Sequence, residues 1–174
     1  MKKLFASVLC MILTLFTVAP NYASAVTVLT DDQIQVVSGA CRQTKTALHE
    51  VHSYDALSRV NLGQRYENIA TRVMAPFISR VNLSGIDAVA ITSTTVEYKR
   101  QTKLFTTAYS RYESTLSEAI KIDCTKDPIG FYNMVVQARE QRAQVNDAVA
   151  GVNNLLKQYK TDFEAIASAH GEAS

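Results

Sequence analysis

In the last third of the chain, apolar residues recur at alternating steps of four and three. Such a heptad pattern, kept up over about five repeats, predicts a long helix that packs at a shallow angle against other helices. Asp127 is a suitable N-cap and Pro128 suits the first helical position. Gly151, beside the seam, is expected to allow a close helix approach. The seam positions are Phe131, Val135, Ala138, Arg142, Val145, Val149, Val152, Leu156, Tyr159, Phe163, Ile166 and His170.

Arg142 is the polar exception in this seam, and we expect its side chain to extend from the seam edge to solvent. A second, more polar seam runs through residues 86–122. Residues 88–96 are rich in β-branched side chains, which favour strands, but no partner strand is visible elsewhere and we predict a helix. The seam consists of Ile91, Thr94, Tyr98, Gln101, Phe105, Ala108, Tyr112, Thr115, Ala119 and Ile122, widened by Leu104, Leu116 and Ile120.

The first helical segment is predicted to begin after Thr30, which forms a capping box with Gln33. Its apolar stripe loses phase within residues 52–61. We therefore predict a kink, stutter or short break near Ser53, and a bend or an end of the helix at Pro76. The stripe comprises Ile34, Val37, Cys41, Thr44, Leu48 and Val51, and resumes as Val60, Gly63, Tyr66, Ala70, Val73 and Phe77.

Two of the three cysteines, Cys41 and Cys124, lie at nearly equal distances from the helix-breaking pair Ser84-Gly85; the third, Cys10, precedes the predicted mature chain. Cys41 precedes Ser84 by 43 residues, and Cys124 follows it by 40. If both spans are helical and reverse at Gly85, the two sulfur atoms return to the same end of the molecule. We therefore predict an all-α fold, an elongated antiparallel three-helix bundle with coiled-coil-like packing and a Cys41–Cys124 disulfide. Two free thiols or an intermolecular bridge are the alternatives.

Residues 1–25 have the three parts of a secretory signal peptide. Lys2 and Lys3 precede an apolar run over 4–19, and Ala23-Ser24-Ala25 offers a cleavage site. The run is shorter than the ~20 residues that span a bilayer. We expect export to the periplasm, the cell envelope or the extracellular space, where disulfides persist. Residues 26–174 are predicted to form a single domain with no membrane span.

The net charge of the mature chain bears on which partners are possible. Of the 18 basic residues, Lys2 and Lys3 leave with the signal peptide, so 16 remain against 16 acidic residues. A mature chain of near-zero net charge offers no electrostatic case for nucleic acid. We expect the partner to be a protein or an envelope component. We favour a monomer over a homodimer, because three amphipathic helices can cover one another.

Few residues suggest chemistry. His49 and His52 lie one helical turn apart and provide a hypothesis of zinc or copper binding, although no cysteine completes the set. The sequence has no nucleophile elbow, no phosphate-binding glycine loop, no Cys-x-x-Cys motif and no Glu-x-x-His pattern of di-iron bundles. We therefore assign no catalytic, cofactor or metal residues and predict that the protein is not an enzyme.

Two resemblances bear on function. Leu29-Thr30-Asp31-Asp32-Gln33 resembles the Leu-Thr-x-x-Gln motif of the Spy/CpxP-type periplasmic chaperones, although the second copy of that motif is absent. That resemblance implies binding of unfolded proteins on an amphipathic face. Residues 55–67, with the bracketing cysteines, resemble exported helical proteins of unassigned function from small-genome bacteria. Gly63 in this stretch is expected to admit a neighbouring helix closely.

The leading functional hypothesis is a non-catalytic exported module that acts through interaction or structure, because a rod-like bundle with no cleft-forming motif offers surfaces rather than an active site. The two alternatives are a periplasmic chaperone for unfolded proteins and a metal-binding protein that uses His49 and His52.

Overall fold

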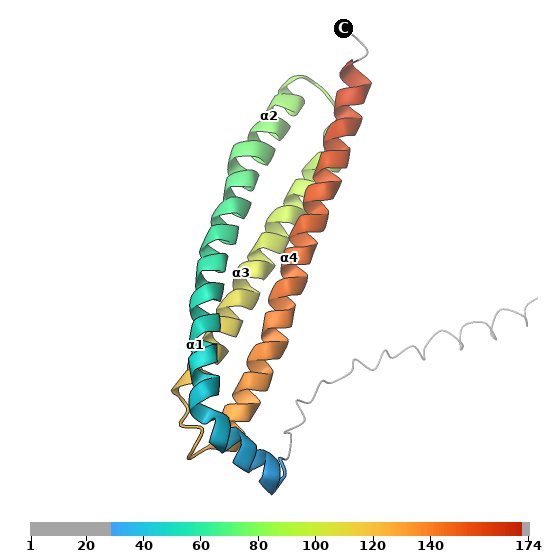
Figure 1. Ribbon diagram of the computed structural model, residues 1–174. Coiled ribbons are helices and arrows are strands. Elements are labelled where there is room, and N and C mark those ends of the chain that lie inside the picture. Colours follow the sequence, from blue (N-terminus) through green and yellow to red (C-terminus); the bar gives the residue numbers. More distant parts are fainter. Residues whose placement is uncertain (1–28, 172–174) are drawn as a thin grey trace, which may run out of the picture.

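In the computed structural model, which describes residues 29–171, the chain is helical and that range contains no strand. The helices are α1 (Asp31–Asn68), the π-helical segment η1 (Ile69–Met74), α2 (Ala75–Leu83), α3 (Val89–Lys121) and α4 (Pro128–Gly171). Because α1, η1 and α2 follow one another directly, the chain makes three long rods (Figure 1). The all-α prediction is confirmed for this range. The predicted signal peptide, residues 1–25, lies outside the described residues.

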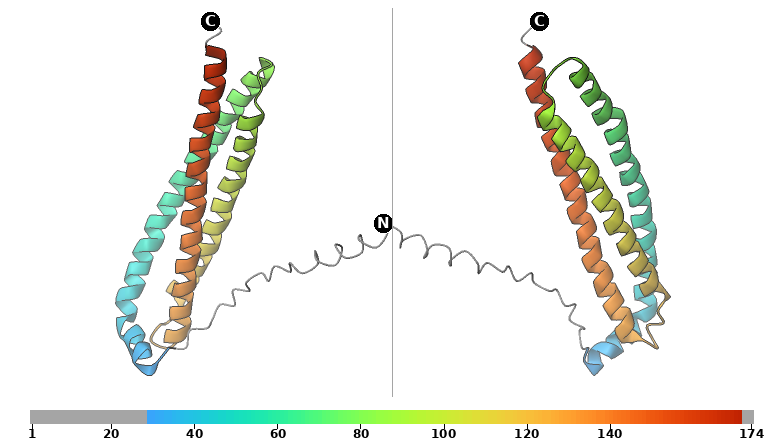
Figure 2. Two further views of the ribbon diagram at one scale, coloured as in Figure 1. Left: turned by 90° about the vertical axis from the view of Figure 1, so that its right-hand side faces the viewer. Right: turned by 180° about the vertical axis from the view of Figure 1, so that it is seen from behind.

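The three rods lie side by side along most of their length (Figures 1 and 2). In Figure 1, α1 and α2 lead from the lower end to the upper end, α3 begins at the upper end, and α4 begins at the lower end. Helix α3 packs on α4 over most of its length, whereas α1 packs less extensively on this pair. No helix in residues 29–171 has an apolar stretch long enough to cross a bilayer.

The predicted helix boundaries with capping signals are confirmed. Gln33 N–H donates to Thr30 Oγ1 at 3.4 Å, and Thr30 N–H donates to Gln33 Oε1 at 2.9 Å. Asp127 Oδ1 accepts from Gly130 N–H at 2.8 Å at the start of α4. Gly85 has φ of 68° in the turn after α2, a left-handed conformation that favours glycine. Local polar side chains therefore determine where α1 and α4 begin, and Gly85 reverses the chain after α2.

The predicted break near Ser53 is wrong, since α1 continues through this residue. Cys41, Leu48, Asp55 and Leu62 follow one another at steps of seven, and each is buried or partly buried. The seam therefore keeps its helical phase, and only its hydrophobicity is interrupted, at Asp55. Val60, which the sequence placed on the resumed stripe, is 51% exposed.

Pro76 does not end the helical rod either. The π-helical segment η1 precedes it, and Ala75 N–H donates to Ala70 O, five residues back. Tyr66, Ala70, Met74 and Ile78 follow one another at steps of four; the first three are buried in the core and Ile78 packs against it. In an α-helix each such step would rotate the side chain by about 40°. The wider π-helical turn keeps these residues on one face.

As a result, Met74 is fully buried and Val73, which the sequence placed on the stripe, is 53% exposed.

The seams of α3 and α4 are largely confirmed. Helix α3 begins at Val89, later than predicted. At this helix start, Val89 N–H donates to Asp87 Oδ1 at 3.0 Å. Leu104, Phe163 and His170 depart from their predicted places and are exposed. The buried seam residues are Ile91, Thr94, Tyr98, Phe105, Tyr112, Thr115, Ala119, Phe131, Ala138, Val145, Val152 and Tyr159.

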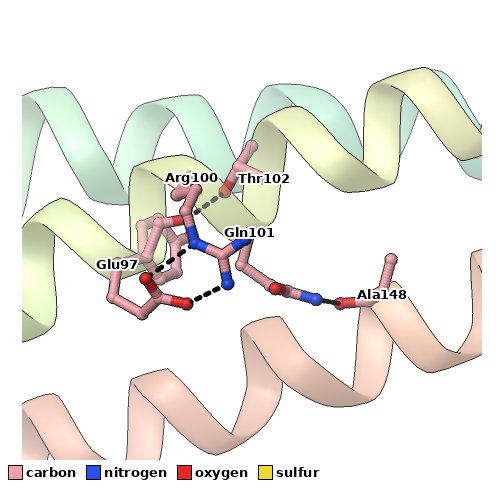
Figure 3. A network of polar contacts seen from close by, with 6 residues as sticks. Glu97, Arg100, Gln101, Thr102 and Ala148 are labelled. Carbon is pink, nitrogen blue, oxygen red and sulfur yellow. Dashed lines mark hydrogen bonds and ion pairs between the residues drawn. The ribbon is translucent and has the colours of Figure 1, made fainter. Parts of the chain in front are cut away.

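The two glycines predicted at close approaches differ. A Cβ added at Gly151 would overlap the side chain of Gln101, whose Nε2 donates to Ala148 O across α3 and α4 at 3.5 Å (Figure 3). The prediction for Gly151 is therefore confirmed. A Cβ at Gly63 would meet no atom within 4 Å, so the prediction of a close neighbour there is wrong.

Cys41 and Cys124 lie at disulfide distance, with their Cα atoms 5.5 Å apart. Both are buried, and they form a small cluster with Phe131. Cys124 follows α3, whereas Gly85 precedes it, so the cluster and the Gly85 turn lie at opposite ends of that helix. Nearby, Lys45 Nζ donates to Ile122 O at 3.1 Å. The prediction that the chain returns these two residues to the same place is confirmed.

Candidate functional site

A partly buried ion pair joins two of the three rods, and a tyrosine of the third rod hydrogen-bonds to it. Arg142 on α4 donates from Nε to Asp55 Oδ2 at 2.8 Å and from Nη2 to Asp55 Oδ1 at 3.0 Å. Tyr112 on α3 donates its hydroxyl to Asp55 Oδ2 at 2.7 Å. The Asp55 carboxylate on α1 thus accepts three hydrogen bonds from two other helices. The paired guanidinium donors are the strong, planar arrangement that arginine forms with carboxylates.

The partners differ in their access to water. Asp55 is 8% exposed, whereas the side chain of Arg142 is 48% exposed. The carboxylate depends on its protein partners, because solvent barely reaches it. The guanidinium keeps part of its hydration. The sequence-based interpretation of Arg142 is therefore corrected: the side chain is half exposed but turns inward, because Asp55 occupies the facing position.

The protonation states of the donors suit these bonds. Burial, and then the hydrogen bond to Asp55, raise the pKa of Tyr112 well above its usual range. The hydrogen bond to Asp55 also raises the pKa of Arg142. Both groups therefore stay protonated at neutral pH, and each can donate to the carboxylate.

A second arginine lies one turn further along α1. The guanidinium carbon of Arg59 lies 5.2 Å from the ring centroid of Tyr109, within the range of a cation–π interaction. Its Nη1 is 3.7 Å from Glu113 Oε2, which is too long for a hydrogen bond. The rings of Tyr109 and Tyr112 meet edge to face, with centroids 5.9 Å apart.

These groups line a pocket of about 240 Å³ between the three rods. The ring of Phe105 and the side chains of Leu62 and Val149 provide apolar surface, while the polar groups lie beside the ion pair. The remaining lining residues are Tyr54, Ser58, Val145 and Asn146. Clefts between helices of a bundle are common places for ligand sites. The arrangement can hold a ligand, but it places no nucleophile beside a base.

His49 and His52 do not line this pocket. His52 Nε2 lies 3.2 Å from Ser117 Oγ, and His49 is exposed on the same helix. No group of three or more His, Cys, Asp or Glu side chains comes together within residues 29–171, so the pair gains no third ligand there. In the same range, no carboxylate hydrogen-bonds to His52 to orient it as a general base.

Sequence reasoning did not identify Asp55 as a site residue. The sequence nevertheless contains a pattern that could have identified it. Asp55 falls two heptads after Cys41, and Arg142 occupies a seam position of the last helix. Opposite charges in two seams of one domain are a pattern typical of a buried ion pair, because an isolated charge in a seam is costly.

Comparisons of this chain with protein-family models, with curated proteins and with solved structures find no match. Both resemblances drawn from the sequence stay predictions.

Proposed function

We propose that the protein is a non-catalytic interaction or structural module of the cell envelope or the extracellular space. In this proposal residues 1–25 are a cleaved signal peptide and residues 26–174 form one antiparallel three-helix bundle. A Cys41–Cys124 disulfide bond closes one end. The distance between the two cysteines and the long seams of α3 and α4 support this architecture.

The observation that carries the proposal is a row of exposed apolar side chains on α1. Tyr54, Leu57 and Val60 follow one another at steps of three and are 69%, 67% and 51% exposed. Residues three apart on a helix are neighbours on its surface. We call these three residues the α1 apolar row. A contiguous apolar surface of this kind favours contact with another protein.

The nature of the partner follows from the same surface. The mature chain has near-zero net charge, so apolar contact rather than long-range attraction would provide the affinity. Helix α1 packs less extensively on α3 and α4 than these two pack on each other, which leaves its outer face available to a partner. A protein or envelope component that presents an apolar groove fits this row. We propose that the module itself is monomeric.

A crosslinking pull-down from the envelope of the producing cell tests this function. The variant Leu57→Ser/Val60→Ser should lose a partner that the unmodified protein captures. The matched control is Val89→Ser/Val96→Ser, which removes two similarly exposed apolar side chains from α3. The control should keep the partner. Equal capture by both variants would argue against the α1 apolar row.

Export has a separate test. Mass spectrometry of protein recovered from outside the cytoplasm should show a chain that begins at Val26, because Ala23-Ser24-Ala25 has small residues where signal peptidase cleaves. A recovered chain that still contains Lys2 and Lys3 would contradict the cleavage.

The exposed row also favours the second candidate, a periplasmic chaperone, since an apolar helix face can bind unfolded chains. This candidate predicts that the protein slows aggregation of an unrelated unfolded client at stoichiometric amounts. Leu57→Ser/Val60→Ser should weaken that effect more than Val89→Ser/Val96→Ser. Many clients in the pull-down would favour the chaperone, and one abundant partner would favour a dedicated module.

A further inference from the structure

The two arginines that line the pocket carry N–H donors that the ion pair does not use. Asp55 already accepts three hydrogen bonds, so its carboxylate has little capacity left. Arginine carries five N–H donors. Arg142 uses two of its own toward Asp55. Arg59 lies too far from Glu113 to hydrogen-bond, and its guanidinium stands over Tyr109.

The rest of the pocket is apolar and aromatic. The rings of Phe105 and Tyr109 on α3 lie 6.5 Å apart between centroids. Leu62 of α1 and Val149 of α4 line the pocket with them. Small-molecule sites in proteins commonly combine a mostly apolar lining with a few convergent polar groups. Here those polar groups are two guanidinium ions at the surface of the pocket, with side chains 39% and 48% exposed.

We propose that this pocket binds a small apolar carboxylate. The carboxylate would accept N–H groups from Arg59 and from the free edge of Arg142, in the planar geometry that guanidinium ions favour. The hydrocarbon part would lie against Phe105 and Tyr109, between Leu62 and Val149. The pocket of about 240 Å³ has room for roughly eight water volumes. A ligand of about eight non-hydrogen atoms therefore matches it.

The preference for a carboxylate comes from donors rather than from net charge. Arg59 and Arg142 are balanced in the pocket region by Asp55 and Glu113. A neutral amide of the same shape offers one acceptor oxygen and two unwanted N–H donors. An amine offers no acceptor once protonated. Both should bind more weakly than the acid.

This inference goes beyond the proposed function and does not depend on it. Leu57 and Val60 do not line the pocket, so the pull-down variants leave the ligand site intact. The two proposals can therefore fail separately.

Binding can be measured by tyrosine fluorescence, because the chain has no tryptophan to mask it and because Tyr54, Tyr109 and Tyr112 line the pocket. The oxidised mature protein would be titrated with hexanoate, hexanamide and hexylamine. We expect a saturable change with hexanoate, with a dissociation constant on the order of 1 mM for so small a ligand. The amide and the amine should bind at least about tenfold more weakly.

Two variants locate the site. Arg59→Gln removes a cation that is not hydrogen-bonded to Asp55, so the ion pair stays, and hexanoate binding should weaken about tenfold. Val149→Phe fills the pocket with a ring while both arginines remain, and it should abolish binding. The control Arg65→Gln removes an exposed charge of the same helix that does not line this pocket, and binding should be unchanged.

Circular dichroism and thermal unfolding of each variant establish that it is folded. Three results would overturn the proposal: no saturable response to hexanoate, equal binding of hexanoate and hexanamide, or equal weakening by Arg59→Gln and Arg65→Gln. If only Val149→Phe fails to fold, the comparison of Arg59→Gln with Arg65→Gln still tests whether the carboxylate binds at this pocket.

Discussion

Asp55 and Arg142 occupy seam positions that apolar residues fill elsewhere. A buried carboxylate is tolerated there because Tyr112 and Arg142 provide three donors. Such a pair adds little net stability compared with apolar packing, but removing one partner leaves an uncompensated group. It can also select one register among helices, since only one alignment brings the groups together. We infer that the pair serves alignment rather than stability.

The first prediction tests this asymmetry. Arg142→Met should lower the free energy of unfolding by roughly 2–3 kcal/mol, since Asp55 stays buried with only Tyr112 as partner; the half-exposed guanidinium keeps the value below that of a fully buried pair. The double variant Asp55→Leu/Arg142→Met should lose less than Arg142→Met alone. Urea unfolding of both variants measures this. A double variant less stable than the single one would contradict it.

The second prediction concerns alkaline pH. Tyr98 is fully buried and its hydroxyl donates to Tyr66 O at 3.2 Å. Burial, and then the neighbouring Tyr66, raise the pKa of Tyr98 from 10.0 to about 12. Between these values the unfolded chain loses the proton and the folded chain keeps it. Stability is therefore fully present below pH 10.0 and falls as the pH rises toward about 12, by roughly 2 kcal/mol from this group.

Urea unfolding at about pH 9 and about pH 11 measures the loss. Tyr98→Phe serves as the comparison, because phenylalanine has no proton to lose. Its free energy of unfolding should fall less between the two pH values than that of the unmodified protein. An equal fall in both would assign the alkaline loss to other groups.

At the scale of the elements, caps and turns follow local chemistry and were visible in the sequence. Thr30, Gln33 and Asp127 cap helices as predicted, and Gly85 turns the chain. The π-helical segment η1 was missed. Its signal was the four-residue spacing from Tyr66 to Ile78, which an α-helix cannot keep on one face. That spacing becomes visible only when Val73 is recognised as exposed, which depends on the partner helices.

The third prediction uses two glycines with opposite expectations. Gly63→Ala should raise the free energy of unfolding by about 0.5–1 kcal/mol, because Gly63 lies inside α1 and a Cβ there meets no atom within 4 Å. Gly85→Ala should lower it by about 1–2 kcal/mol, because φ at Gly85 is 68°. Thermal or urea unfolding of the two variants measures this. Changes of the same sign would contradict the assigned backbone roles.

For the whole molecule, the decisive contact is the one between Cys41 and Cys124. These residues are separated by 83 positions. A bond between them would constrain a long loop of the unfolded chain, and we expect reduction to lower the free energy of unfolding by about 4–5 kcal/mol in the chain-entropy model. The variant Cys41→Ser/Cys124→Ser should be destabilised similarly and should no longer respond to reductant.

Intact mass provides the direct readout of that fourth prediction. The protein should gain about two daltons on reduction, one hydrogen per sulfur. No gain in mass would indicate free thiols, and a halving of the mass would indicate an intermolecular bridge. Unfolding in the presence and absence of reductant then gives the size of the stabilisation.

The sequence by itself determined the helices and their caps, the turn at Gly85 and the meeting of the two cysteines. Each depends on local backbone chemistry or on simple chain length. Tertiary structure decided what the polar seam residues do. A lone Asp55 resembles a break in an apolar stripe, and a lone Arg142 resembles a surface residue. Only the packing of three rods brings them within hydrogen-bond distance and leaves a pocket beside them. Whether a charged side chain is stable at a buried position depends on the groups that the fold places around it.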